Sequence, residues 1–194
     1  MRRKRVGILI SGRGSNMAAL IEAAKAADYP AEIVLVLSNV PDAAGLETAR
    51  AAGIATAAID HRPYRRDRAA HERAMAERLD QAGVEIVCLA GYMRLLSPYL
   101  VGRYAGRMLN IHPSLLPAYP GLDTHARVLA AGEAEHGCTV HLVTEVMDEG
   151  PILAQARVKV LPGDTEETLA ARVLEQEHRL YPAALAAHVL GVCG

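Results

Sequence analysis

The sequence has neither phenylalanine nor tryptophan, and its seven tyrosines are the only aromatic residues. Because 51% of the 194 residues are nevertheless hydrophobic, we expect a core of aliphatic side chains. An excess of positive charge is also missing, since 21 Lys and Arg stand against 22 Asp and Glu and the net charge is -1. No overall positive field attracts the phosphates of nucleic acid, so no nucleic-acid partner is expected.

Cysteine is scarce as well, with residues only at Cys88, Cys138 and Cys193. They are far apart and form no CxxC pair, so a reducing, cytoplasmic compartment fits better than a disulfide-stapled secreted domain. The apolar run from Val6 to Ile10 is too short for a signal peptide or a membrane span. Because the chain shows no repeats or linkers, residues 1–194 are expected to form a single domain.

Short apolar runs alternate with helical patterns in the first half of the chain, which is typical of βα units in a largely parallel sheet. The predicted strands cover residues 5–10, 32–37, 54–59 and 84–90. The predicted helices are one that begins at a Ser15 and Asn16 cap, one over residues 42–52 and one over residues 64–81.

Beyond Gly91 the pattern changes to short strands separated by loops rich in proline and glycine, in place of full helices. The predicted strands cover residues 108–111, 139–144 and 152–160, and we expect some of them to be antiparallel. A capping-box pattern at 164–167 predicts a last helix that runs to about Leu180, where the Tyr181-Pro182 pair should kink or end it.

A glycine-rich turn, Gly12-Arg13-Gly14-Ser15-Asn16, joins the first strand to the first helix. Free backbone N–H groups and the helix dipole at such a point bind anions, and glycines allow the backbone to approach closely. A dinucleotide fingerprint would need glycine where Met17 stands, so a single phosphate is the better match. A tight turn without a ligand is the alternative.

A polar pair, Asn110 and His112, lies at the end of a predicted strand, before a loop bounded by prolines. Residues at i and i+2 of a strand point to one face, so the amide and the imidazole project together. An amide donor beside an imidazole can hold a developing oxyanion and move a proton. The alternative is a strand-end histidine that bonds to the loop backbone.

Two acidic residues are candidates to complete such a site. Asp148 lies in a turn between two predicted strands, where an acid is usually a solvated turn former, but beside His112 it would favour the imidazolium. Glu177 lies in the apolar arc of the last helix, so its carboxylate needs a partner. That partner is either an arginine or an amine or hydroxyl of a ligand.

Metal ligation is a weaker interpretation of the same residues. His112, His141 and Asp148 could form a set of two histidines and a carboxylate, but no two of them have a short metal-ligand spacing, so we expect no metal. Further histidines are interpreted as ordinary core or surface residues: His71, His125, His136, His178 and His188.

Four segments together resemble the phosphoribosylglycinamide formyltransferase family in order and spacing, from about Val6 to Pro182. They are SGRGSN at 11–16, LAGYMRLLS at 89–97, NIHPSLLP at 110–117 with YPG at 119–121, and VMDEGP at 146–151. The resemblance implies one α/β formyltransferase domain with a Rossmann-like, mostly parallel twisted sheet, antiparallel strands in the C-terminal half and helices on both faces. The implied activity is transfer of the formyl group of 10-formyltetrahydrofolate to the amine of phosphoribosylglycinamide, in purine biosynthesis and without a metal.

The resemblance also implies roles for single residues, and the catalytic ones are Asn110, His112 and Asp148. The implied substrate-binding residues are Gly14, Ser15 and Asn16 at the phosphate, and Glu177. The implied folate-binding residues are Arg68, Met93, Arg94, Leu95, Leu96, Thr144 and Val146, together with Asn110 and Asp148. Arg65 and Arg66 lie close to Arg68 and stay open as alternatives to it, and Asp123 is given no role.

Other outcomes stay open. Formyltetrahydrofolate deformylase uses a similar trio but passes the formyl group to water, and it carries a regulatory domain in front, for which we expect no room because the first strand begins at residue 5. Methionyl-tRNA formyltransferase carries an RNA-binding domain that this length and charge do not provide. Rivals from other classes are a metal-dependent hydrolase and a phosphate-binding module without activity. We expect small-molecule substrates, no membrane partner, and a monomer or homodimer.

Overall fold

The computed structural model describes residues 2–192; Met1, Cys193 and Gly194, and with them the expectation for Cys193, lie outside the described residues. Its strands are β1 (Lys4–Ile10), β2 (Ala31–Ser38), β3 (Thr56–Ala58), β4 (Ile86–Leu89), β5 (Met108–His112), β6 (Glu135–Leu142) and β7 (Ile152–Lys159). Its helices are α1 (Ser15–Ala23), α2 (Ala44–Ala51), α3 (Arg68–Gln81), α4 (Pro98–Arg103), α5 (Thr124–Ala131) and α6 (Glu166–Leu190), with a short 3-10 turn, η1 (Arg62–Tyr64), before α3. In this part of the chain, no helix is both long and apolar enough to cross a membrane.

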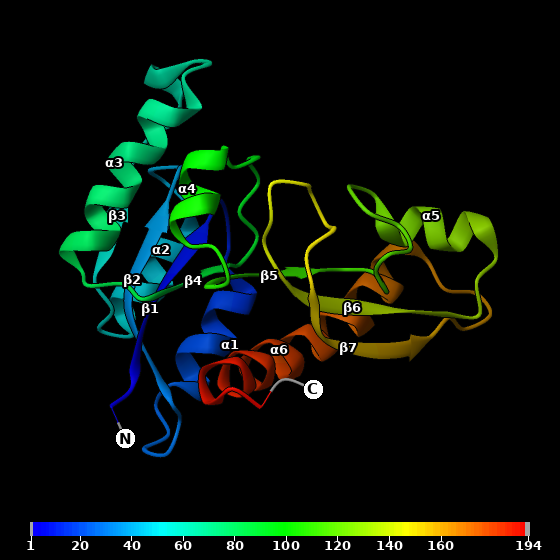
Figure 1. Cartoon of the computed structure of the whole chain (residues 1–194). Helices are drawn as coiled ribbons and strands as arrows, with labels where there is room; N and C mark the ends of the chain where they lie inside the picture. The colour runs from blue at the N-terminus through cyan, green and yellow to red at the C-terminus, as the bar shows by residue number, and fades with distance from the viewer. Residues whose placement is uncertain (1, 193–194) are drawn as a thin grey trace.

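One sheet of seven strands runs through the molecule in the order β3-β2-β1-β4-β5-β6-β7 (Figure 1). The pairs from β3 to β5 are parallel, whereas β6 pairs with both β5 and β7 in antiparallel register. The predicted α/β class, mostly parallel with antiparallel strands in the C-terminal half, is therefore confirmed. Because parallel strands leave their carboxyl ends at one edge, the loops that follow β1, β4 and β5 begin at the same edge of the sheet.

Helices cover both faces of the sheet, as the alternation along β1 requires. Ile8 and Ile10 belong to a cluster with α1, α2 and α6, whereas Leu9 belongs to a second cluster with α3 and α4. Each of these fully buried side chains contributes about 1.5 to 3 kcal/mol by leaving water. Most buried members of the two clusters are aliphatic, as the composition predicts, and Tyr104 and Tyr181 are the aromatic exceptions.

Two short helices in the second half, α4 and α5, are absent from the sequence-based prediction. Helix α4 starts with Pro98 and contains Gly102, so its composition is that of a loop, yet Leu100 is fully buried. Helix α5 has only 8 residues, of which Thr124 and Val128 are buried, so it is too short to establish a helical period. The prediction of loops in place of helices is wrong at these two places.

Helix α3 begins at Arg68, later than the predicted start at Tyr64. The Asp67 carboxylate accepts the backbone N–H of Ala70 at 2.9 Å, and this N-cap sets the start of the helix. The residues just before it form the separate turn η1. The local capping chemistry thus decides the boundary, where the apolar pattern alone extends too far.

Helix α6 has a capping box, but one built from different residues than predicted. Thr165 is the N-cap, and the hydroxyls of Thr165 and Thr168 each accept the other residue's backbone N–H. The Asp164 carboxylate pairs instead with the Arg172 guanidinium at 2.7 Å. Asp164, the predicted cap residue, therefore forms an ion pair, and Thr165 and Thr168 form the capping box.

Helix α6 continues through Pro182 to Leu190, so of the two outcomes expected at the Tyr181-Pro182 pair, a kink or an end, the end is wrong. Proline removes one helical hydrogen bond and clashes with the preceding turn. The neighbouring side chains of Tyr181, Ala184 and Leu185 are buried in the core. Tertiary packing on both sides of the proline outweighs its local cost.

The Tyr181 hydroxyl fixes α6 to the middle of the sheet. It is fully buried and lies 3.0 Å from the carbonyl oxygens of both Leu89 and Leu109. These carbonyls belong to β4 and β5. The last helix is thereby attached to two of the strands whose following loops carry predicted site residues.

Gly45, near the start of α2, lies against the glycine-rich turn after β1. Its N–H donates to the Gly12 carbonyl at 3.0 Å. A Cβ at this position would lie 2.6 Å from Ile10 Cδ1 and 2.9 Å from the Gly12 oxygen. Helix α2 therefore packs so closely on the turn that only glycine fits.

We predict that Gly45→Ala lowers the free energy of unfolding by about 1 to 3 kcal/mol, because the added methyl group displaces the turn. Gly102→Ala is the matched control, since it is also helical and an added Cβ meets nothing within 4 Å. The better helix propensity of alanine should stabilise that variant by about 0.5 to 1 kcal/mol. Urea unfolding followed by circular dichroism measures both, and equal effects would contradict the close packing.

Candidate active site

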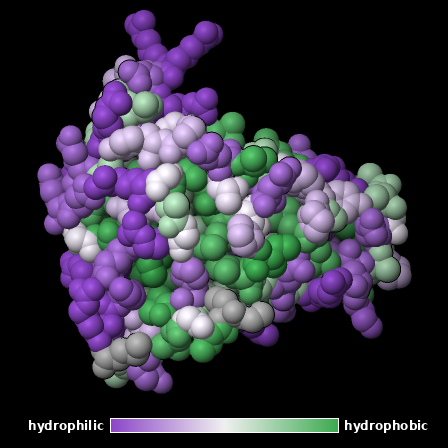
Figure 2. Space-filling view, viewed as in Figure 1, coloured by the Kyte–Doolittle hydropathy of each residue, from purple (hydrophilic) through white to green (hydrophobic). Residues whose placement is uncertain are grey.

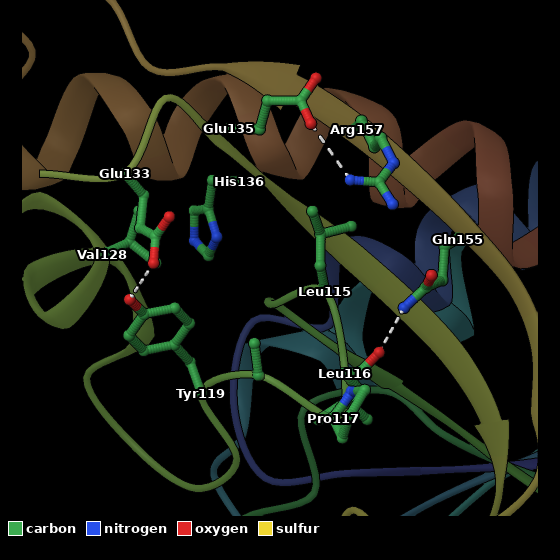
Figure 3. Close-up of a pocket in the computed structure, with 11 residues that line it drawn as sticks. Leu115, Leu116, Pro117, Tyr119, Val128, Glu133, Glu135, His136, Gln155 and Arg157 are labelled. Carbon is green, nitrogen blue, oxygen red and sulfur yellow. Dashed lines mark hydrogen bonds and ion pairs between the residues drawn. The ribbon is translucent and has the colours of Figure 1, made fainter. Parts of the chain in front are cut away.

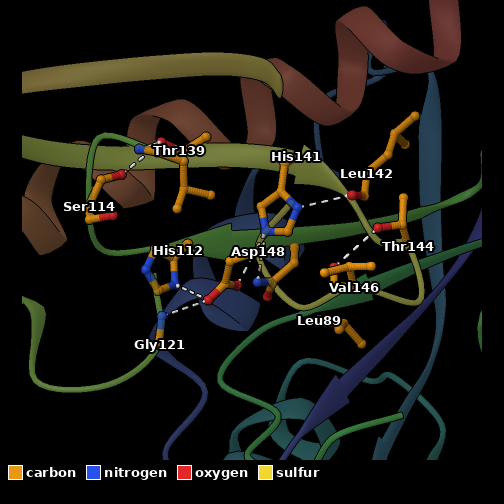
Figure 4. Close-up of polar contacts among 12 residues, drawn as sticks. Leu89, His112, Ser114, Gly121, Thr139, His141, Leu142, Thr144, Val146 and Asp148 are labelled. Carbon is orange, nitrogen blue, oxygen red and sulfur yellow. Dashed lines mark hydrogen bonds and ion pairs between the residues drawn. The ribbon is translucent and has the colours of Figure 1, made fainter. Parts of the chain in front are cut away.

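His112 and Asp148 lie side by side (Figure 4), although one comes from β5 and the other from the turn between β6 and β7. Asp148 Oδ2 is 3.6 Å from His112 Nδ1, and both side chains are only 8% exposed. Asp148 adopts a φ of 57°, a left-handed conformation that is uncommon for residues with a side chain. The meeting of these two residues, which the chain pattern alone leaves open, is present in the fold.

Both ring nitrogens of His112 face oxygen atoms. Nε2 lies 3.0 Å from the carbonyl oxygen of Tyr119, and Nδ1 faces the Asp148 carboxylate. The Nε2 contact has hydrogen-bond length, whereas the 3.6 Å contact between Nδ1 and Asp148 is longer than a hydrogen bond. Asp148 Oδ2 also accepts the N–H of Gly121 at 2.9 Å, so the loop after β5 is tied to the same carboxylate. The histidine thus contacts both the loop backbone and the predicted acid.

His141 is a member of this site that the sequence suggests only as a metal ligand. It lies directly opposite Asn110 in the register of β5 and β6. Its Nε2 is 3.2 Å from Asn110 Nδ2 and 3.8 Å from Asp148 Oδ1. Asn110, His112 and Asp148 are therefore brought together with His141 among them. No spacing along the chain signals this contact, because it depends on which residues the two strands pair.

His112, His141 and Asp148, the set considered as metal ligands, do come together. Backbone carbonyls of Tyr119 and Leu142 take one nitrogen of each ring, which leaves the other nitrogen facing Asp148. Within residues 2–192, no group of three His, Cys, Asp or Glu side chains is arranged to hold a metal ion.

The glycine-rich turn leads from β1 directly into α1. Gly14, with a φ of 68°, precedes the helix and no side chain caps it, so the predicted cap by Ser15 and Asn16 is wrong. The Asn16 amide is used elsewhere, because its Nδ2 donates to Glu177 Oε2 at 2.7 Å. The first N–H groups of α1 have no side-chain cap in the described part of the chain, which leaves them available to an anion.

Glu177 is buried, and burial raises the pKa of its carboxyl group while the Asn16 amide lowers it. Its partner is thus an amide, and not the arginine that was one of the two expectations. Asn16 Oδ1 is buried and has no hydrogen-bond partner among residues 2–192. Such an acceptor is suited to a donor group of a ligand. The structure therefore joins Glu177 of α6 to the turn after β1.

Ser11 links this turn to the loop after β4. Its hydroxyl accepts the N–H of Met93 at 2.9 Å and donates to Asn39 Oδ1 at 2.6 Å. Its own N–H donates to the Gly91 carbonyl at 3.2 Å. Sequence reasoning places Ser11 in a motif without a role. Its contacts fix the glycine-rich turn relative to the loop that carries residues 93–96.

Apolar side chains are exposed on the two segments predicted to bind folate. Met93 and Leu95 are 68% and 58% exposed on the loop after β4, and Val146 is 55% exposed on the turn that carries Asp148. Exposed apolar side chains that gather on loops are typical of a ligand-binding surface. The other predicted residues on these two segments are Arg94, Leu96 and Thr144.

Arg68 is the first residue of α3 and is exposed, as are Arg65 and Arg66 before it. Figure 2 shows hydrophilic residues over the protruding end of the molecule where α3 begins. All three guanidinium groups are therefore accessible to a ligand, and the choice of Arg68 among them stays a prediction.

Glu72 on α3 is a carboxylate, 2% exposed, that anchors the loop after β4. It accepts the N–H of Ser97 at 2.7 Å and also accepts the Ser97 hydroxyl. Ser97 is the N-cap residue of α4 but makes no cap hydrogen bond, since its hydroxyl is bonded to Glu72. The Ser97 side chain therefore does not cap α4. It bonds to Glu72 instead, and this contact fixes the end of the loop that carries residues 93–96. No local pattern in the sequence signals this contact.

We predict that Glu72→Gln lowers the free energy of unfolding by about 1 to 3 kcal/mol, because a neutral amide replaces two charge-assisted hydrogen bonds to Ser97 with weaker neutral ones. Glu77→Gln, at an exposed position of the same helix, is the control and should change stability by less than about 0.5 kcal/mol. Urea denaturation of the two variants measures the difference. Equal stabilities would show that Glu72 does not anchor the loop.

A cavity of about 370 Å³ lies beside residues 115–119 (Figure 3), and none of the predicted site residues lines it. Its wall includes the buried His136 and the side chain of Gln155. Tyr119 also lines the cavity, while its carbonyl oxygen contacts His112. The cavity therefore borders the site through one residue of the loop after β5 and is separate from it.

A family model described as Formyl transferase matches residues 4–185 of the chain. Phosphoribosylglycinamide formyltransferase of Escherichia coli (strain K12) is 48% identical over 178 residues, which cover 92% of this chain and 84% of that protein. The crystal structure of phosphoribosylglycinamide formyltransferase from Brucella melitensis is 60% identical with a TM-score of 0.93, covering 97% of this chain and 96% of that one. The trifunctional purine biosynthetic protein adenosine-3 of Homo sapiens is 45% identical over 184 residues, 95% of this chain, which spans 18% of that longer protein.

Proposed function

This chain belongs to the formyl transferase family, and on that premise we propose that it transfers the formyl group of 10-formyltetrahydrofolate to the amine of phosphoribosylglycinamide. The proposal places the protein in purine biosynthesis, which its similarity to the trifunctional purine biosynthetic protein adenosine-3 of Homo sapiens supports. The observation that carries it is the Asp148 carboxylate 3.6 Å from Nδ1 of His112, which lies on β5, the strand that also carries Asn110. This trio matches the needs of acyl transfer between two bound substrates.

The reaction begins when the substrate amine attacks the formyl carbon, which turns the formyl oxygen into an oxyanion. An N–H of the Asn110 amide stabilises that oxygen together with the Nε2–H of the protonated His112 ring, which exchanges the Tyr119 carbonyl for the oxyanion while Nδ1 keeps facing Asp148. His112 is buried, and donors fixed in a site with little water act more strongly than donors in solution. Because the oxyanion exists only in the intermediate, this contact lowers the barrier and adds little to substrate binding.

The intermediate collapses when the bond between the formyl carbon and folate N10 breaks. The attacking amine loses a proton and the departing nitrogen gains one, and His112 serves this transfer as the acid and base of the site. Asp148 holds the ring in its orientation and stabilises its positive charge. The proposed path needs neither a metal nor a covalent enzyme intermediate, because two substrates held in line supply much of the acceleration.

The substrates bind on either side of the trio. Gly14, Ser15 and Asn16 take the phosphate of phosphoribosylglycinamide at the start of α1, and Glu177 accepts a hydroxyl or amine of the same molecule. Since the chain has no Phe or Trp, apolar side chains and backbone groups hold the pterin ring without stacking on either of those two residue types. The folate-binding residues in this proposal are Arg68, Met93, Arg94, Leu95, Leu96, Thr144 and Val146, with Asn110 and Asp148 at the formyl end.

A transfer assay with both substrates tests the proposed function. We expect release of deformylated folate to depend on phosphoribosylglycinamide and to be unchanged by EDTA. Release without the amine would indicate a deformylase. Loss of turnover on chelation, restored by zinc or iron, would indicate a metal-dependent hydrolase. Binding of phosphate with no turnover would indicate a binding module.

Substitutions in the trio test the assigned roles. We predict that His112→Ala and Asp148→Ala each lower kcat by about 100-fold or more, because one removes the acid and base and the other removes its counter-charge. Glu149→Ala, at an exposed acid next to Asp148 in the same turn, is the matched control and should keep the wild-type kcat. Circular dichroism verifies that all three variants fold. Wild-type turnover in either trio variant would overturn the mechanism.

A further inference from the structure

The pairing of β5 and β6 places an imidazole against the amide that the proposed mechanism uses. Asn110 and His141 are directly opposite in the antiparallel register, so their side chains share one face of the sheet. The His141 side chain is 3% exposed and contacts Asn110 Nδ2 through Nε2 at 3.2 Å. We propose that His141 is a positioning residue that orients the Asn110 amide toward the formyl oxygen, an inference that rests on the proposed function.

The hydrogen-bond partners of His141 define which nitrogen carries the proton. Nδ1 lies 2.9 Å from the carbonyl oxygen of Leu142, and a carbonyl only accepts, so the proton is on Nδ1. In a neutral ring Nε2 is then an acceptor, and Asn110 Nδ2 donates to it. One amide hydrogen is held by His141 in this way. The second hydrogen on the same nitrogen acquires a fixed direction and is the one available to an oxyanion.

The neutral form of His141 is the one that its surroundings favour. Burial lowers the pKa of His141, and the nearby His112 lowers it further, against the Leu142 carbonyl and the Asp148 carboxylate, which raise it. A protonated Nε2 would instead be a donor facing a donor, and Asn110 would have to turn its oxygen toward the ring. The amide would then present an acceptor in place of a donor and could not stabilise an oxyanion.

A neutral His141 also leaves Asp148 to the other ring. The carboxylate stands between the two imidazoles, with Oδ2 3.6 Å from His112 Nδ1 and Oδ1 3.8 Å from His141 Nε2. Without a proton on Nε2, His141 offers no hydrogen bond to Oδ1. Among residues 2–192, the partners left to Asp148 are then His112 and the Gly121 N–H. The two histidines thus have different roles in the proposal: His112 carries the charge, and His141 orients the Asn110 amide.

Three variants test the inference in the transfer assay. His141→Leu removes the acceptor and should lower kcat by about tenfold to a hundredfold with little change in either KM, since the lost contact is made in the transition state. His141→Gln supplies a side-chain oxygen that can accept from Asn110, cannot be protonated near neutral pH, and should restore most of kcat. His141→Leu added to Asn110→Ala should cause no further loss of kcat, because His141 acts through Asn110.

His136→Leu is the control. His136 is a buried histidine on the same strand but outside the trio, and this variant should keep the wild-type kcat.

The contrary outcomes are distinct. Wild-type kcat in His141→Leu, a His141→Gln variant as slow as His141→Leu, or losses that multiply in the double variant would each overturn the inference. Should His141→Leu fail to fold, the spectroscopic measurement described next, which uses only the wild-type protein, still decides the question. Failure of the wild-type protein to transfer a formyl group would instead overturn the proposed function.

A spectroscopic measurement tests the ring state without any reaction. We expect the ¹⁵N shifts of His141 in the wild-type protein at neutral pH to show a protonated Nδ1 and an unprotonated Nε2. A proton on Nε2, alone or together with one on Nδ1, would overturn the inference whatever the activity of the protein.

Discussion

The buried carboxylate of Asp148 is the constraint on which the rest of the site depends. A charge removed from water has to be matched by donors or opposite charge, and here the Gly121 N–H donates to the carboxylate and the ring of His112 lies 3.6 Å from it. Asp148 is held in a left-handed backbone conformation, which costs free energy and persists only where the surroundings enforce it. The loop after β5 and the turn between β6 and β7 are therefore joined by the same charge that the proposed chemistry uses.

Other contacts in the fold hold the turn after β1 and the loop after β4, the two proposed substrate-binding segments, at fixed positions relative to Asp148. The Ser11 hydroxyl joins the turn after β1 to the loop after β4, Glu72 holds the far end of that loop, and Tyr181 attaches the last helix to β4 and β5. Each anchor is a buried or half-buried polar group bonded to backbone, so moving it would leave a donor or acceptor unpaired. Proximity catalysis needs such rigidity, because it depends on reacting atoms staying in line.

Local patterns in the sequence predict what local physics decides. The apolar runs identify the parallel strands, and the two-residue period of a strand places Asn110 and His112 on one face. Contacts between distant segments escape this reasoning: His141 opposite Asn110 depends on strand register, and the serine anchors depend on how loops meet. Helix α6 continues through Pro182 because core packing outweighs the local cost of proline in a helix. The residues next to Pro182 in the sequence do not indicate this packing. The family resemblance supplies the substrates, which no spacing in the chain defines.

The most direct test of how this site works is a crystal structure of the protein with phosphoribosylglycinamide and a non-reactive analogue of the formyl donor. We predict that the phosphate lies on the Gly14–Asn16 turn, and that the substrate amine and the formyl position of the analogue meet beside Asn110 and His112. A phosphate bound elsewhere, such as in the cavity beside residues 115–119, or a formyl position away from His112, would contradict this arrangement.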